Sequence, residues 1–157
     1  MHNQFKNESG FSLVELLLAI TIGGIVMALA LPAYQDMVQN NCMTANTNTL
    51  VANLQLARSE ATKRGQNIRV IAEGGSWSVG WTIQDPSNVV IRDVDLTCGA
   101  TTITETGGDT TLVYKSTGFI DSPATFNICD SRTAETGRQV TINTVGRPNT
   151  NSNFTCT

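Results

Sequence analysis

A single carboxylate lies at the start of the most apolar stretch of the chain. Glu15 is followed by an uncharged run from Leu16 to Leu31. An ionised carboxylate placed in lipid costs at least a few kcal/mol, and such residues are seldom accidental. We therefore expect Glu15 to have a partner that offsets this cost.

The other reactive side chains speak against catalysis. The one histidine, His2, precedes the apolar run, so a chain processed after the leader has no imidazole for a Ser-His or Cys-His nucleophile or for a histidine-ligated metal. No spacing of carboxylates indicates an acid–base pair. We expect no enzyme, no metal site and no cofactor.

The four cysteines predict disulfide bonds. They are widely spaced, without a Cys-x-x-Cys pair, which disfavours a zinc knuckle or a dithiol redox motif. Behind an export-type segment, two disulfides formed in an oxidising compartment are the expected use. Three pairings are open. We favour Cys42–Cys98 and Cys129–Cys156, because neighbours in sequence order most easily staple a small domain.

Composition suits one domain plus an appendage. The chain has 157 residues and a net charge of -3. Its apolar residues are concentrated in Phe11–Ala33, and the remainder is rich in Thr, Asn, Ser and Gly, as in a polar extracellular domain. This balance lacks the basic footprint of a dedicated nucleic-acid binder.

Three interpretations compete for the first 33 residues. Ala28-Leu29-Ala30 offers a signal-peptidase site, but Glu15 interrupts the apolar run and Pro32 lies just beyond the cut. A buried core helix that is apolar all round needs a larger protein. A membrane-inserted helix fits the length, since Phe11–Ala33 spans about 34 Å.

The segment that begins with Gly10 and continues Phe11-Ser12-Leu13-Val14-Glu15-Leu16-Leu17 resembles the amino-terminal signature of type IV pilins and type II secretion pseudopilins. The resemblance implies that a prepilin peptidase cuts after Gly10 and methylates the new terminal amine of Phe11. It also supplies a partner for Glu15, the terminal amine of a neighbouring subunit. Glu8-Ser9 depart from the family, in which basic residues are more usual before the glycine.

The resemblance also implies a domain organisation and a location. Residues 1–10 would be the leader peptide, 11–40 the transmembrane and filament-core helix, and 41–157 the globular domain. The chain would cross the bacterial inner membrane once, with its globular domain in the periplasm, and then enter a filament. Its partners would be other major and minor pilins or pseudopilins.

Beyond Pro32 the pattern predicts an α+β domain in which the long helix packs on an antiparallel β-sheet. An apolar stripe ends near Gly65, and comprises Met43, Thr47, Leu50, Leu54, Ala57 and Ala61. Alternation then predicts strands at Ile68–Ala72 and Trp77–Gln84, joined by a hairpin turn at Glu73–Ser76, and at Val89–Val94, Thr111–Lys115, Thr125–Cys129 and Gln139–Val145. We expect both tryptophans in the core.

Motifs in this domain resemble the GspH/FimT group, which contains the type II secretion pseudopilin H and the minor pilins FimT and FimU. They are Leu56–Gly65, Trp77 with Gly80-Trp81, Gly118-Phe119, Cys129-Asp130 and Val145-Gly146-Arg147. With the leader, the similarity covers nearly the whole chain. The group implies a minor pilin that helps prime pilus assembly or, alternatively, a pseudopilin of a secretion filament; cysteines near the carboxy terminus favour the pilus.

A third alternative is a DNA-binding minor pilin for DNA uptake. FimT-like proteins bind DNA through a tail with a Gly-Arg-x-Arg motif. Here Gly146-Arg147-Pro148 is followed by Asn149, so Arg147 alone would give a weak, salt-sensitive interaction. Arg132 and Arg138 would join it only if the strands bring them together.

Overall fold

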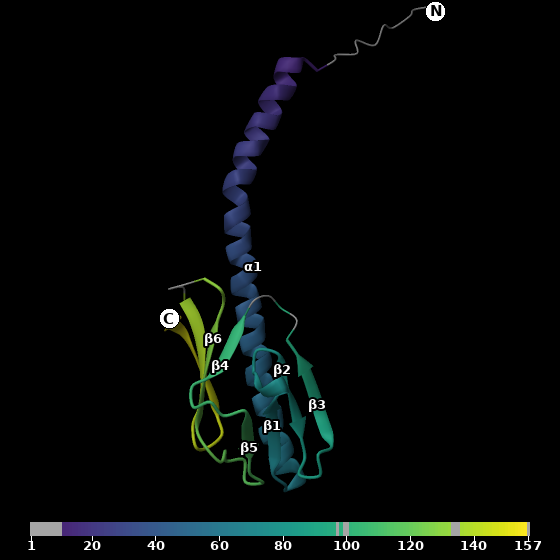
Figure 1. Cartoon of the computed structure of the whole chain (residues 1–157), viewed down its shortest axis with the longest axis vertical. Coiled ribbons are helices and arrows are strands. Elements are labelled where there is room, and N and C mark those ends of the chain that lie inside the picture. Colours follow the sequence, from purple (N-terminus) through teal and green to yellow (C-terminus); the bar gives the residue numbers. More distant parts are fainter. Residues whose placement is uncertain (1–10, 97, 99–100, 133–135, 157) are drawn as a thin grey trace, which may run out of the picture. The chain divides into compact units, whose positions relative to one another are not determined.

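The computed structural model describes residues 11–96, 98, 101–132 and 136–156. The chain divides into two compact units, one ending at Val38 and the other beginning at Gln39. Helix α1 (Leu13–Arg64) runs from the first unit into the second (Figure 1).

In the first unit α1 is apolar and unburied. Every side chain from Leu13 to Val38 is exposed. The helix includes an 18-residue window of mean hydropathy 2.4, none of it buried, and is therefore long and apolar enough to cross a membrane. It stays helical through Gly23-Gly24 and Pro32, although glycine and proline lower helix stability.

In the second unit the predicted stripe of α1 is confirmed. All six of its residues, from Met43 to Ala61, are buried. The helix ends at Arg64, and Gly65 follows with φ +64, a left-handed conformation that suits glycine. The amide of Gln66 then donates to the carbonyl of Ala61, which closes the last turn.

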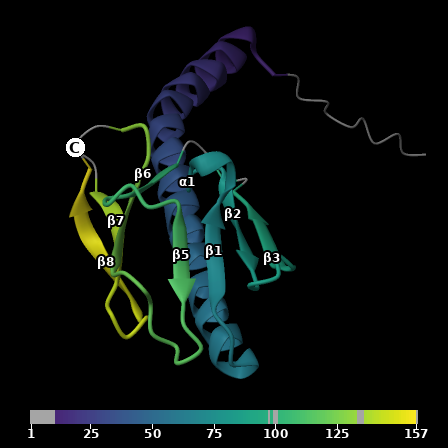
Figure 2. The same ribbon diagram turned by 60° about the horizontal axis from the view of Figure 1, so that its bottom comes forward.

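Within the described residues, eight strands form two antiparallel four-stranded sheets rather than the single predicted sheet. The first has the order β3-β2-β1-β5 and the second the order β4-β6-β7-β8. The strands are β1 (Ile68–Ala72), β2 (Gly80–Gln84), β3 (Val90–Asp95), β4 (Thr102–Glu105), β5 (Thr111–Tyr114), β6 (Ala124–Cys129), β7 (Thr136–Ile142) and β8 (Pro148–Thr155). Both sheets lie along the second part of α1 (Figures 1 and 2).

One core joins the helix and both sheets. Trp81, Tyr114 and Phe126 are completely buried, and Trp77 packs edge-on against Phe126 with ring centroids 5.0 Å apart. Burial of large aromatic side chains supplies a major share of the hydrophobic stabilisation. The predicted α+β class, with a helix packed on antiparallel strands and both tryptophans in the core, is confirmed.

The strand predicted at Trp77–Gln84 begins too early. β2 starts at Gly80 and pairs antiparallel with β1, which confirms the predicted hairpin, but the connection is longer than Glu73–Ser76: it runs to Val79 and contains a short 3-10 helix at Glu73–Gly75 followed by a turn. Val79 is exposed within this connection. Trp77 is buried for another reason, since its indole Nε1 donates to the carbonyl of Asp109 at 2.8 Å.

Candidate functional site

The first unit presents a large exposed apolar surface. Its large apolar side chains are all exposed, and Phe11, just before the helix, is 76% exposed. An apolar surface of this extent marks a membrane or protein interaction site. Gly10, the residue on the other side of the expected cleavage point, lies outside the described residues.

Glu15 lies in the first turn of α1 and is exposed. Within the part of the chain that the structure describes, its side chain has no ion pair or hydrogen bond. A carboxylate in the first turn is favoured by the helix dipole, but that effect is worth at most about 1 kcal/mol at an exposed site. The dipole therefore does not replace a cationic partner once the segment is surrounded by apolar groups.

Both disulfides lie in the second unit. Cys42 is joined to Cys98 and Cys129 to Cys156, which is the pairing favoured from sequence order. The first bond ties α1 to the segment after β3, and Asn46 reinforces it by donating from Nδ2 to the carbonyl of Cys98 at 3.1 Å.

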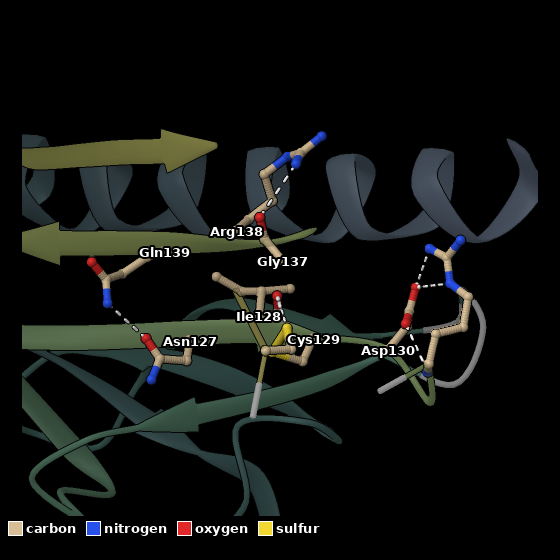
Figure 3. The surroundings of a disulfide bond; sticks show 9 residues. Asn127, Ile128, Cys129, Asp130, Gly137, Arg138 and Gln139 are labelled. Carbon is tan, nitrogen blue, oxygen red and sulfur yellow. Dashed lines mark hydrogen bonds and ion pairs between the residues drawn. A yellow bond between two sulfur atoms is a disulfide. The ribbon is translucent and has the colours of Figure 1, made fainter. Parts of the chain in front are cut away.

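The second disulfide fastens the end of β8 to β6 (Figure 3). Gly137, on β7, makes room for it, because a Cβ on that residue would lie 2.4 Å from the Sγ of Cys156 and 2.8 Å from the carbonyl oxygen of Ile128. The strand therefore needs a residue without a side chain at this point.

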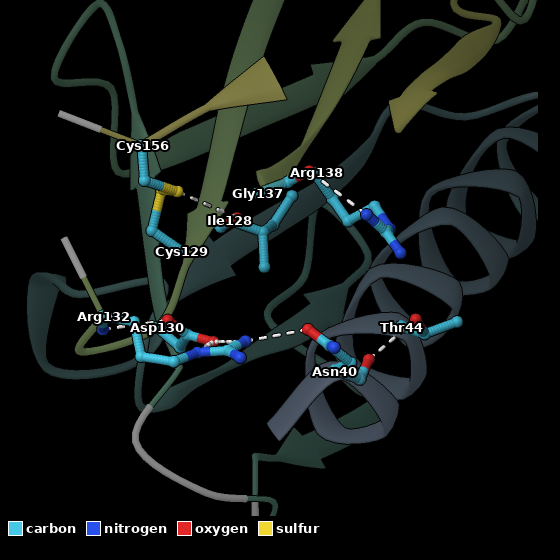
Figure 4. A network of polar contacts seen from close by, with 9 residues as sticks. All are labelled: Asn40, Thr44, Ile128, Cys129, Asp130, Arg132, Gly137, Arg138 and Cys156. Atoms are coloured by element: carbon cyan, nitrogen blue, oxygen red, sulfur yellow. Dashed lines mark hydrogen bonds and ion pairs between the residues drawn. A yellow bond between two sulfur atoms is a disulfide. The ribbon is translucent and has the colours of Figure 1, made fainter. Parts of the chain in front are cut away.

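A polar network next to this disulfide reaches α1 (Figure 4). The Asp130 carboxylate accepts hydrogen bonds from the backbone amide of Arg132 at 3.0 Å and from its Nε at 2.9 Å. Arg132 also donates from Nη2 to the Oδ1 of Asn40 at 2.8 Å. We call these three residues the helix clamp, because they hold the segment after β6 to α1 at Asn40, where the second unit begins.

The helix clamp is also an electrostatic pair. The Asp130 side chain is 5% exposed and that of Arg132 is 19% exposed. The Arg132 guanidinium lowers the pKa of Asp130 below its ordinary value, chiefly through the side-chain hydrogen bond. In the sequence Asp130 is visible only as part of a family motif, and nothing there points to Asn40, because Asn40 lies 90 residues before Asp130 and 92 before Arg132.

The three arginines considered for DNA do not form one patch. Arg132 is committed to the helix clamp, and Arg138 donates to the carbonyls of Gly137 and Ser152. Arg147 is exposed in the turn between β7 and β8. Arg138 lies near the other end of this hairpin. The stretch of β7 from Arg138 to Ile142, where the strand ends, spans about 13 Å.

Comparison with known proteins identifies the family. Residues 46–146 match the family model described as "Type II transport protein GspH", and residues 5–31 match the "Prokaryotic N-terminal methylation motif". The chain is 34% identical over 113 residues to the type IV major alpha-pilin of Moraxella bovis. This match covers 65% of this chain and 70% of that protein.

Two solved structures have a similar fold. The type IV minor pilin FimU of Pseudomonas aeruginosa superposes with a TM-score of 0.68 at 25% identity, over 76% of this chain and 96% of that chain. The minor pseudopilin EpsH of the Vibrio cholerae type II secretion system has a TM-score of 0.57 at 15% identity, over 74% and 97%, which shows the fold alone. The chain therefore belongs to the GspH family of type IV pilin-like structural proteins, which are not enzymes.

Proposed function

We propose that this protein is a minor pilin, which enters a type IV pilus through its N-terminal helix and helps to prime pilus assembly. The observation that carries the proposal is the unburied apolar face of α1 from Leu13 to Val38, with the carboxylate of Glu15 in its first turn, directly before the uncharged run Leu16–Leu31. The likeness to FimU, with 25% identity and a TM-score of 0.68 against 15% and 0.57 for EpsH, supports a pilus in preference to another filament.

The proposed route begins at the inner membrane. The prepilin peptidase cleaves between Gly10 and Phe11 and methylates the amine of Phe11, while the apolar helix holds the chain in the bilayer. During assembly, the Glu15 carboxylate pairs with the terminal amine of an adjacent subunit. Leaving either charge unpaired in apolar surroundings is strongly unfavourable, so the pair selects the correct axial register.

The test is a Glu15→Ala variant expressed in the native host. Mass spectrometry first establishes the mature terminus, where a methylated Phe11 is expected. The variant should accumulate in the membrane fraction as the wild type does, but its share in sheared filaments should fall severalfold. Glu73→Gln, which alters an exposed acid in the second unit, is the control and should enter filaments normally. Normal incorporation of Glu15→Ala would overturn the proposal.

A pseudopilin of a type II secretion filament is the second candidate, favoured by the GspH family model over residues 46–146. Both candidates use the same helix and the same Glu15 pairing. They are separated by deletion of the gene, which should reduce surface pili in the first case and leave pili intact but retain secreted proteins in the periplasm in the second.

A further inference from the structure

A small cavity lies where the connection from β1 to β2 meets β4 and the turn between β4 and β5. Its volume is about 250 Å³. Two sets of hydrogen bonds fix its walls. Ser78 Oγ donates to the carbonyl of Ile103 and accepts from its amide, at 3.2 and 2.9 Å, and Trp77 Nε1 donates to the carbonyl of Asp109. The cavity is therefore formed before any ligand enters.

Glu105 places a carboxylate in the wall of this cavity. The residue is only 7% exposed. Its Oε2 accepts the backbone amide of Asp109 at 2.8 Å, and its Oε1 accepts the amide of Thr125 at 3.4 Å. A carboxylate has about four acceptor positions, so roughly two stay unused.

The cavity supplies no positive charge for Glu105. None of the residues that line it is basic, and a second acid, Asp109, is among them. Within the described residues Glu105 has no ion pair. Burial of an ionised carboxylate costs several kcal/mol unless it is paired and fully hydrogen-bonded, and one of the two hydrogen bonds present is long. The Glu105 carboxylate therefore accepts fewer hydrogen bonds than a buried carboxylate requires.

From this cavity and its buried carboxylate we infer a binding site for an ammonium group, namely the side chain of a lysine from an adjacent filament subunit. A volume of about 250 Å³ is below the roughly 300–1,000 Å³ of sites for drug-sized ligands and cofactors, and suits the end of one side chain. The lysine ammonium would donate to the unused acceptor positions of Glu105, with its aliphatic stem against the cavity wall.

Lysine fits this carboxylate better than arginine does. A guanidinium gains most when both oxygens of a carboxylate are free for a bidentate fork. Here each oxygen of Glu105 already accepts a backbone amide. A compact ammonium with three rotatable donors can use the positions that are left.

The identity of the donor rests on the proposed function, because a neighbouring subunit has to supply the lysine. The site itself is tested without a filament. The mature full-length chain, labelled with ¹⁵N in detergent micelles, is titrated with n-butylammonium chloride. The reporters are the backbone amide of Asp109 and the indole of Trp77; Trp81, the other of the two tryptophans, serves as an internal reference for folding.

Saturable shifts of the Asp109 amide and the Trp77 indole are expected with n-butylammonium. Neutral n-butanol and sodium chloride at equal concentrations should cause neither. Glu105→Gln keeps the size of the side chain but removes its charge, and should weaken binding at least about tenfold. Glu60→Gln, which removes a carboxylate on α1, is the matched control and should bind as the wild type does.

Thr110→Lys covers the case in which Glu105→Gln does not fold. Thr110 lines the cavity from the segment before β5 and is itself exposed, so a lysine there would supply the ammonium from within the chain and abolish the titration while Glu105 is retained. The proposal is wrong if n-butanol or calcium chloride gives the same shifts, or if Glu105→Gln or Thr110→Lys binds as the wild type does. Failure here leaves the minor-pilin proposal standing, and failure of Glu15→Ala to impair incorporation leaves the ammonium site standing.

Discussion

Arg58 donates its Nε–H to the carbonyl oxygen of Gly118 at 3.0 Å, across 60 residues of sequence. Gly146 lies against the same oxygen, since a Cβ on Gly146 would be 2.5 Å from it. The helix and two separate turns therefore meet at one buried carbonyl. This junction gives a physical reason for three of the motifs that resemble the GspH/FimT group, those around Arg58, Gly118 and Gly146.

Gly146→Ala should destabilise the protein by about 3 kcal/mol. Part of the loss comes from φ +73, which costs a residue with a side chain roughly 1–2 kcal/mol. The rest comes from the clash with Gly118 and with the Tyr114 ring, 2.9 Å from the added Cβ. The free energy of unfolding in urea measures the effect.

Gly108→Ala is the matched control for this prediction. Gly108 has φ +80, but a Cβ there would meet nothing within 4 Å. Gly108→Ala should therefore lower the free energy of unfolding only by the cost of the left-handed backbone conformation, about 1 kcal/mol. Equal losses for the two variants would contradict the view that Gly146 is required by close packing at the junction.

Removal of the Cys129–Cys156 bond should cost about 3–4 kcal/mol. The bond closes a loop with a sequence separation of 27, and such a loop constrains the unfolded chain by roughly that amount. The double variant Cys129→Ser, Cys156→Ser should therefore unfold at a lower urea concentration than the wild type. Hydrogen exchange should also show that β8 loses protection before β6 and β7 do. Uniform loss of protection in all three strands would contradict a local role for this disulfide.

The sequence predicted the regular parts of the fold because their patterns are local. The stripe on α1 follows the helical period, and strands such as Ile68–Ala72 alternate cleanly. The alternation of Trp77, Val79 and Trp81 was misleading, because Trp77 is buried by a hydrogen-bonded turn and Val79 is not buried at all. A period of two cannot distinguish these cases.

The missed strands lack a strong pattern of their own. β8 (Pro148–Thr155) is rich in asparagine and mostly exposed, and such residues are depleted in strands. β8 is held in place by its pairing with β7 and by the disulfide of Cys156, the residue that follows the strand. The helix clamp and Glu105 were missed for a related reason, because each depends on residues brought together only by the tertiary fold.

Asp130→Asn should destabilise the protein by about 1–2 kcal/mol at pH 7, because a charge-assisted hydrogen bond to Arg132 becomes a neutral one. The pKa of Asp130 is lowered in the folded state, so its contribution is present above the pKa of the unfolded chain, about 3.9. It is lost as the pH falls through the lower pKa of the folded state. The wild type and the variant should therefore converge in stability in strong acid.

Two comparisons make this pH dependence specific. The pKa of Glu60 is also lowered, first through its hydrogen bond from Arg64, but that contribution is common to the wild type and the variant and cancels in their difference. Asn40→Ala removes an acceptor of Arg132 without removing a charge, so its smaller loss should not change with pH. A difference between wild type and Asp130→Asn that persists in acid would contradict the prediction.

DNA binding should be weak and should depend on Arg147. With Arg132 and Arg138 committed to other groups, one exposed arginine offers about one phosphate contact, so the logarithm of affinity should fall with the logarithm of salt with a slope near -0.9. In a gel-shift assay with the full chain, Arg147→Gln should abolish any retardation seen at low salt, and about 0.15 M salt should abolish it for the wild type. Asn149→Arg adds a second cation on β8, and should steepen the slope to about -1.8. Retardation of the wild type that survives at this salt concentration would show that a basic surface other than Arg147 binds DNA.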